Sequence, residues 1–191
     1  MNDSSSVRAN VGVEAGGIAG CSPVVMNDQS SVSRNQGRQA GGIVVNRVVM
    51  NDHSAVVGNS SRQYGGGIYA FTVAMHDHSQ IVRNSAHRGG GVYGGGRGRI
   101  AVSMSGRSRI SRNVARGLGG GIYSRWADVV LRDSASVAFN VAGFAGGGVL
   151  SWASCAPDLG RVVVRDRAQV SRNQPDNTAT RIDPCPDCGC G

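Results

Sequence analysis

The sequence predicts an all-β fold, a single-domain parallel β-helix of about seven coils. Two observations predict it: one motif recurs about every 25 residues, and the apolar residues within each repeat alternate over short, β-branched runs. Gly, Asn, Asp and Ser end each run, which is typical of tight turns between strands. We therefore expect stacked coils over residues 1–174 and a Cys-rich tail over residues 175–191.

The repeat is anchored on the motif [VI]-x-x-N, and each copy but the last is followed by Gly-Gly-[IV]. In a parallel stack, equivalent residues of neighbouring coils lie about 4.8 Å apart, so each position of the repeat becomes a column. We expect the Val, Ile and Met columns to fill the interior, and the Gly pairs to allow positive φ and close approach of neighbouring coils.

The Asn column is expected to form a hydrogen-bonded ladder at a bend of the chain, where Asn tolerates unusual backbone angles. Its members are Asn10, Asn35, Asn59, Asn84, Asn113, Asn140 and Asn173. A single coil cannot bury enough apolar surface to offset the entropy of ordering its backbone, so stability is expected from stacking.

The pairing of the two motifs resembles the repeats of the polymorphic outer membrane protein family, whose hallmarks are GGAI and FxxN. The matching segments are GGIV at 41–44, GGIY at 66–69 and 120–123, GGVY at 90–93, VSRN at 32–35 and ISRN at 110–113. Val or Ile replaces the Phe of FxxN in every copy. The resemblance covers residues 1 to about 174 and implies a right-handed parallel β-helix, typical of surface-exposed or secreted passenger regions that act in adhesion.

This scaffold does not by itself define a function. The resemblance favours a non-catalytic binding module, extracellular or at the cell surface, whose ligand is a glycan or a protein. The alternative is a pectate-lyase-like polysaccharide lyase or hydrolase that uses carboxylates on one face of the helix, because such enzymes share the scaffold. A third interpretation is a structural fragment with no activity of its own.

An acidic column precedes the anchoring Val or Ile by four positions: Asp3, Asp28, Asp52, Asp77, Asp133 and Asp166, with Gly106 in the remaining copy. Stacked carboxylates are candidate ligands for Ca²⁺, which binds oxygen. A second candidate metal site combines Asp52, His76, Asp77 and His78. The simpler interpretation is that each Asp accepts backbone N–H bonds in its own turn and that the His side chains lie on the surface. No cofactor is predicted apart from this candidate calcium.

All 20 basic side chains are Arg, and the formal net charge is +8. One arginine series directly precedes an anchoring Asn: Arg34, Arg83, Arg112 and Arg172. A second series follows that Asn by three residues: Arg38, Arg62 and Arg116. The resulting basic stripe suits an anionic glycan or a surface protein. Nucleic acid is the weaker candidate, because aromatic residues are not interleaved with the arginines. The alternative is that these arginines are solvated and pair with the Asp column.

Trp126 and Trp152 are further candidate binding residues, because the loop at 151–161 interrupts the repeat and such insertions often lie on a binding face. No apolar run approaches the roughly 18 residues of a membrane span, and no signal peptide opens the chain. Met1 aligns with the Met column, which predicts an exposed first rung, a longer solenoid or an end-to-end assembly.

Overall fold

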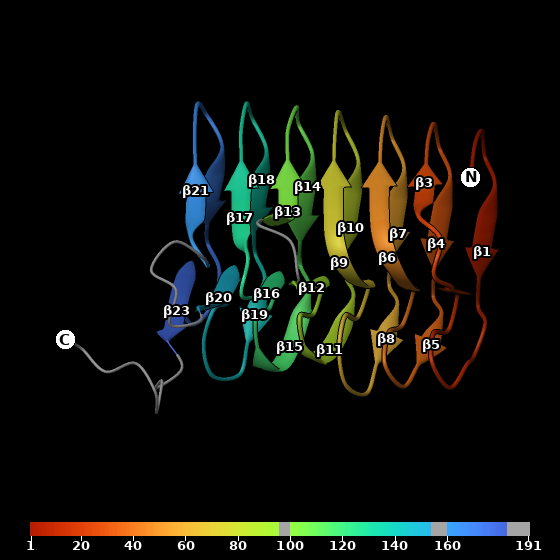
Figure 1. Cartoon of the computed structure of the whole chain (residues 1–191), viewed down its shortest axis with the longest axis horizontal. Helices are drawn as coiled ribbons and strands as arrows, with labels where there is room; N and C mark the ends of the chain where they lie inside the picture. The colour runs from red at the N-terminus through yellow and green to blue at the C-terminus, as the bar shows by residue number, and fades with distance from the viewer. Residues whose placement is uncertain (96–99, 154–159, 183–191) are drawn as a thin grey trace.

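The chain folds as a parallel β-helix in the computed structural model, which describes residues 1–95, 100–153 and 160–182 (Figure 1). These residues form strands and turns and contain no helix, so none of them belongs to a helix able to cross a membrane. The strands of neighbouring coils pair in parallel, which confirms the predicted fold class. Residues 183–191 of the predicted Cys-rich tail 175–191, and Cys155 as well, lie outside the described residues.

The first wall of the solenoid is a seven-stranded sheet. The central residue of each strand is the anchoring Val or Ile, and these residues pair in register, for example Val32 with Val56 and Val56 with Ile81. The strands are β1 (Ser6–Arg8), β4 (Ser31–Ser33), β7 (Ala55–Val57), β10 (Gln80–Val82), β14 (Arg109–Ser111), β18 (Ser136–Ala138) and β22 (Gln169–Ser171).

The second wall is a five-stranded sheet that directly follows the Asn column in each coil. Its strands are β5 (Gln36–Gly37), β8 (Ser60–Ser61), β11 (Ser85–Arg88), β15 (Val114–Leu118) and β19 (Val141–Ala142). In Figure 1 this sheet lies at the lower edge of the view, away from the turns at the upper edge.

The remaining strands form one eleven-stranded sheet. They are β2 (Ile18–Ala19), β3 (Val24–Met26), β6 (Ile43–Met50), β9 (Ile68–Met75), β12 (Val92–Gly95), β13 (Ile100–Met104), β16 (Ile122–Arg125), β17 (Asp128–Leu131), β20 (Val149–Ala153), β21 (Val162–Val164) and β23 (Thr178–Ile182). Because β23 pairs with β20, the sheet continues beyond the boundary predicted at residue 174. The repeat did not reveal β23, since that segment lacks the Gly-Gly-[IV] motif.

The interior is filled by apolar columns, as predicted. Met26, Met50 and Met75 are fully buried, and the anchoring residues Val32 and Ile81 are buried in the same core. Neighbouring members of a column pair in register, so each side chain packs against its equivalents in the coils on either side. A continuous core therefore results from coils that could not each form one.

The seven Asn side chains form one continuous hydrogen-bonded column. Nδ2 of Asn35 donates to Oδ1 of Asn59 at 3.0 Å, and Asn59 donates in the same way to Asn84 at 3.0 Å. The backbone N–H of each of these donors reaches the same oxygen, at 2.9 Å from Asn35 and 2.8 Å from Asn59. At the other end of the column, Asn173 donates to Oδ1 of Asn177 at 3.2 Å. The column thereby satisfies amide groups that are buried from water.

Residues with positive φ make the corners of each coil. One set is the Asp column, with φ between 54° for Asp3 and 57° for Asp133. The other set directly precedes the anchoring Asn: Ala9, Arg34, Gly58, Arg83, Arg112, Phe139 and Arg172. The expectation that Asn itself adopts the unusual backbone conformation is therefore wrong. The residue before each Asn adopts the positive φ that turns the chain, and the Asn side chain takes part in the hydrogen-bonded column.

The Gly pairs allow close approach between coils, as expected. A Cβ added to Gly66 would lie 2.3 Å from the carbonyl oxygen of Gly90 in the next coil. Positive φ, however, is found at the residue before the pair, as at Gly65 with φ 47°. The two Gly residues of the pair are therefore required because a side chain there would clash with the next coil, and not because they adopt a positive φ.

Candidate functional site

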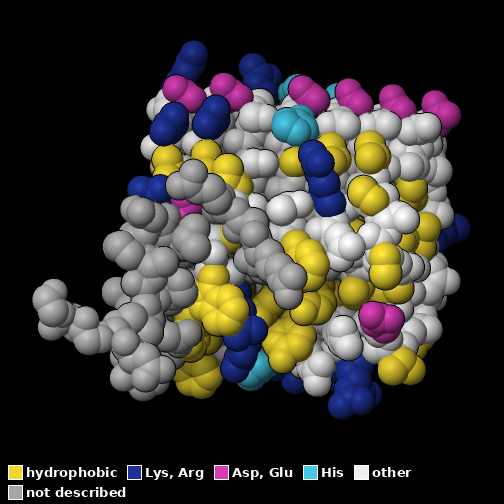
Figure 2. All heavy atoms as spheres, viewed as in Figure 1, with side chains coloured by type: hydrophobic (Ala, Val, Ile, Leu, Met, Phe, Trp, Pro, Cys, Tyr) yellow, Lys and Arg dark blue, Asp and Glu magenta, His cyan; other side chains and the backbone are white. Residues whose placement is uncertain are grey.

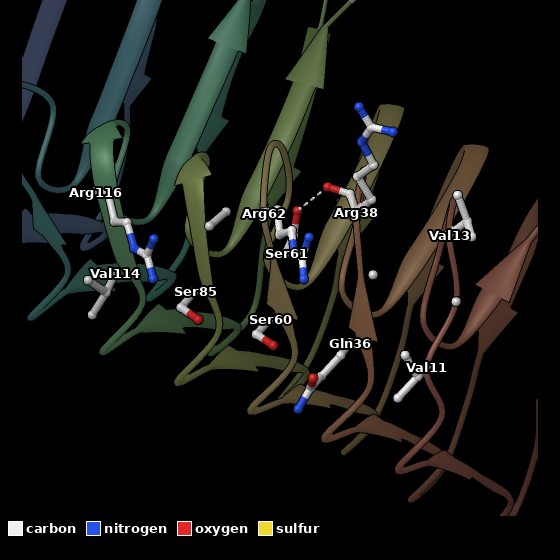
Figure 3. A pocket seen from close by; sticks show the side chains of 13 residues that line it. Val11, Val13, Gln36, Arg38, Ser60, Ser61, Arg62, Ser85, Val114 and Arg116 are labelled. Carbon is white, nitrogen blue, oxygen red and sulfur yellow. Dashed lines mark hydrogen bonds between the residues drawn. The ribbon is translucent and has the colours of Figure 1, made fainter.

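The outer face of the five-stranded sheet carries an open groove of about 830 Å³ (Figure 3). Five successive coils line it, with residues 11–13, 36–38, 60–62, 85–86, and 114 with 116. Gln36, Ser60 and Ser85 pair in register and form one row of amide and hydroxyl groups. The groove therefore runs along the helix axis, across the strands.

Arg38, Arg62 and Arg116 border this groove, and all three are exposed. In Figure 3 the guanidinium groups of Arg62 and Arg116 point toward the side of the row of Ser60 and Ser85, whereas that of Arg38 points away. Within the described residues none of the three forms an ion pair, so the alternative pairing with the Asp column is not observed. The lining residues include no carboxylate, so the groove is basic, and Glu14 lies with Arg38 in the lining of an adjoining hollow.

The predicted binding residues Arg34, Arg83 and Arg112 occupy the adjacent corner rather than the groove lining. Each is exposed and lies between a strand of the seven-stranded sheet and the following position of the Asn column. The second arginine series lies on the other side of the Asn column. The two series therefore flank the start of the five-stranded sheet from both sides.

The two tryptophans lie together at the eleven-stranded sheet, Trp152 on β20 and Trp126 in the bend between β16 and β17. The backbone N–H of Trp126 donates to the carbonyl oxygen of Trp152 at 2.7 Å. The guanidinium carbon of Arg125 lies 4.0 Å from the Trp126 ring centre, a cation–π contact. The Trp152 ring lies 6.2 Å from that of Tyr123. The structure therefore does not bring the tryptophans to either arginine series.

The candidate metal ligands do not converge. The rings of His53 and His78 stack in parallel with centroids 4.9 Å apart, and Nδ1 of His76 lies 2.9 Å from Oγ of Ser105. In residues 1–95, 100–153 and 160–182, no three His, Cys, Asp or Glu side chains are grouped as metal ligands would be. The proposed combination of Asp52, His76, Asp77 and His78 thus forms no metal site in this part of the chain.

The Asp column forms a row of carboxylates at the turns between the eleven-stranded and seven-stranded sheets. Figure 2 shows acidic side chains aligned along this edge, at the top of the view. Each carboxylate after Asp3 accepts a bond from the backbone of the preceding coil: Asp28 from Asp3 at 3.0 Å, and Asp52 from Asp28 at 3.2 Å. We expected each Asp to accept backbone N–H bonds within its own turn. The observed hydrogen bond instead joins two neighbouring coils.

A cluster of tyrosines on the outer side of the eleven-stranded sheet was not predicted. Tyr69, Tyr93 and Tyr123 each follow a Gly-Gly-[IV] motif and pair in register. The Tyr93 and Tyr123 rings stack 4.8 Å apart, and Tyr64 packs 4.9 Å from Tyr93. Burial raises the pKa of Tyr93, and the nearby Arg125 guanidinium partly opposes this rise. The recurrence of GGIY, GGVY and GGIY was the available sequence signal.

Comparisons of this chain with protein-family models, curated proteins and solved structures give no match. The resemblance to polymorphic outer membrane protein repeats accordingly rests on the short motifs alone. What is established is the parallel β-helix, with a basic groove on one sheet and an acidic row at a separate edge.

Proposed function

We propose that this chain is a non-catalytic binding module, secreted or at a cell surface, that holds an acidic glycan in the groove of the five-stranded sheet. The observation that carries the proposal is the groove itself, bordered by Arg38, Arg62 and Arg116 without a carboxylate among its lining residues. A guanidinium group donates parallel hydrogen bonds to carboxylate or sulfate oxygens. The row of amide and hydroxyl groups beside the arginines offers partners for sugar hydroxyls.

Two further observations support this proposal. The net charge of +8 attracts anionic polymers over distances longer than a single contact. The motifs that resemble polymorphic outer membrane protein repeats support a location outside the cell and a role in adhesion. The repetitive β-helix provides a rigid face on which a ligand meets groups already held in place.

The alternative, a polysaccharide lyase or hydrolase that uses carboxylates on one face, requires those carboxylates to lie against its substrate. The Asp side chains instead accept backbone hydrogen bonds along the acidic row, for instance Asp166 from Asp133 at 3.0 Å. That row lies at the turns before the seven-stranded sheet, whereas the groove lies on the five-stranded sheet. These positions favour binding over turnover.

The test is calorimetric titration with polygalacturonate, heparin and chondroitin sulfate, with and without Ca²⁺, at low and high salt. We expect saturable binding that weakens with salt and leaves the polymer intact. Replacing Arg62 and Arg116 together by Ala should weaken binding about tenfold, on the order expected for two exposed charge contacts. The matched control replaces Arg47 and Arg165, which are exposed on other faces, and should bind as the unmodified protein does.

Three results would contradict the proposal. The first is cleavage of a polymer that is abolished by Asp52→Ala or Asp77→Ala. The second is an equal loss of affinity in both double-arginine variants, which would indicate a diffuse charge effect. The third is failure of every acidic polysaccharide to bind at low salt.

A further inference from the structure

We infer, on the basis of the proposed function, that the ligand is a linear acidic polysaccharide that lies along the helix axis and stacks a sugar ring on Phe144. Three features of the outer face of the five-stranded sheet carry this inference. They are the direction of the groove, the spacing of its arginines and an exposed aromatic side chain one coil beyond Arg116.

The groove extends across the strands rather than along them. Its lining comes from five successive coils, so it spans four steps of about 4.8 Å, or about 19 Å. Within one coil the groove is narrow, since no coil contributes more than three lining residues, as at 36–38 and 60–62. An elongated ligand therefore makes most contact when its long axis follows the helix axis.

The positive charge is distributed along the same direction. Arg62 and Arg116 lie two coils apart and point toward the row of Ser60 and Ser85, whereas Arg38, one coil before Arg62, borders the groove with its guanidinium group pointing away. Each coil thus offers at most one groove arginine, which suits anionic groups repeated along a chain. A compact ligand with a single anionic group would reach only one of these arginines and would leave most of the groove empty.

Phe144 lies one coil beyond Arg116, outside the lining residues of the groove, and Gly143 takes the repeat position of the groove arginines in that coil. The backbone N–H of Phe144 donates to the carbonyl oxygen of Gly117 at 2.9 Å, which places it beside the residue that follows Arg116. Phe144 is 73 % exposed, and Val114 and Val141, which pair with each other on β15 and β19, are 44 % and 39 % exposed. Gly117 has no side chain to cover the aromatic ring. An exposed aromatic ring one coil beyond the last groove arginine offers a flat apolar surface to the C–H face of a sugar ring on a ligand that extends past the groove.

This combination favours a polysaccharide over other polyanions. A nucleic-acid strand would need several aromatic platforms for successive bases, and the lining residues of the groove include no aromatic side chain. Inorganic polyphosphate carries charge but no apolar face, so it would gain nothing from Phe144. An acidic polysaccharide presents both anionic groups and apolar ring faces along one chain.

The test measures the affinity of the full chain for heparin-derived oligosaccharides from disaccharide to decasaccharide, and for polygalacturonate oligomers of the same lengths. We expect affinity to rise with length until the oligosaccharide spans the groove and then to level off. Phe144→Ala should weaken binding of the longer oligosaccharides about fivefold, as for loss of one exposed aromatic contact, and Phe144→Trp should retain it. Phe71→Ala is the matched control, because Phe71 is 51 % exposed on β9.

Inorganic polyphosphate and an oligothymidylate complete the experiment. Equal binding of polyphosphate to the unmodified protein and Phe144→Ala is expected, because only charge is involved. Oligothymidylate that binds more tightly than the glycans would overturn the inference in favour of nucleic acid. Affinity that does not depend on length, or an unchanged affinity in Phe144→Ala, would overturn it while leaving the proposed function intact. Loss of all glycan binding at low salt would instead remove the proposed function itself.

Discussion

The side-chain amide of Asn84 donates a 3.0 Å hydrogen bond to Oδ1 of Asn113, and the backbone N–H of Asn84 donates to the same oxygen at 2.9 Å. Nδ2 of Asn84 also donates to the carbonyl oxygen of Val56 at 3.0 Å. One buried side chain therefore joins three consecutive rungs, because its own Oδ1 accepts from Asn59 in the preceding coil. The Asn column acts as a network whose members depend on one another.

Asn84→Asp should destabilise the fold by about 3 kcal/mol or more at neutral pH, because a buried carboxylate would face two acceptor oxygens, on Val56 and Asn113. The folded-state pKa of the new carboxyl would be raised. The free energy of unfolding is therefore lowered most at neutral pH. This destabilisation shrinks as the pH falls toward about 4, the pKa of the new carboxyl in the unfolded chain. Denaturant unfolding at neutral and acidic pH measures this. Asn46→Asp, at an exposed position, should change stability little, and a pH-independent loss in Asn84→Asp would contradict the explanation.

Ser79→Ala should stabilise the protein by about 1 kcal/mol, because the Ser79 hydroxyl is buried and has no hydrogen-bond partner among the described residues. Ser30, Ser54 and Ser108 occupy the same column, and their hydroxyl groups are likewise buried without a hydrogen-bond partner among the described residues. The column continues with Ala135, which is also fully buried. The reciprocal variant Ala135→Ser should lower the thermal unfolding midpoint. A fall of the midpoint in Ser79→Ala would show that the hydroxyl has a role this geometry does not reveal.

Gly66→Ala should destabilise the protein by about 3 kcal/mol, since its Cβ would meet backbone atoms of the next coil at 2.3 Å and 2.5 Å. Neither contact can be relieved by rotation of a side chain. Gly20→Ala is the matched control, because a Cβ there would have no neighbour within 4 Å. Chemical denaturation of both variants measures the difference. Equal stability of the two would mean that neighbouring coils separate at little cost.

Stability should fall as the pH rises above about 10, partly because burial raises the pKa of Tyr93 above its ordinary value of 10.0. The unfolded chain then loses the Tyr93 proton at a lower pH than the folded protein does. Above pH 10.0 the unfolded state binds fewer protons, and alkali favours it. In Tyr93→Phe this contribution is absent, so the unfolding midpoint should decline less between about pH 9 and about pH 11. Parallel curves for the two proteins would refute the prediction.

Much of the fold could be predicted because parallel, in-register stacking converts a sequence period into spatial adjacency. The pairing of Val32 with Val56 follows directly from their equivalent positions in the repeat. Backbone conformation at the corner did not follow, because an Arg at positive φ, as at Arg34, is not anticipated from its usual preferences.

The groove was harder to predict than the core. Arg34 and Arg62 each belong to an arginine series at a fixed distance from the anchoring Asn, so the sequence does not distinguish them. Only the three-dimensional arrangement of the sheets shows that Arg62 borders the groove. Phe144 lies outside both motifs, so no period marks it. Surface shape depends on the angles between sheets and on side-chain directions, neither of which is encoded in a repeat length.

The Asn and Asp columns are directional, and this has a consequence for how such a protein changes length. Each interior coil donates to the coil that follows it and accepts from the coil before it, as Asn59 does between Asn35 and Asn84. Neighbouring coils are therefore interchangeable parts with the same two surfaces. Addition or deletion of one whole unit, such as the 24-residue step from Asn35 to Asn59, would preserve the hydrogen-bond pattern of the Asn column. The length of each sheet face would thus change in steps of one coil while the architecture stayed constant.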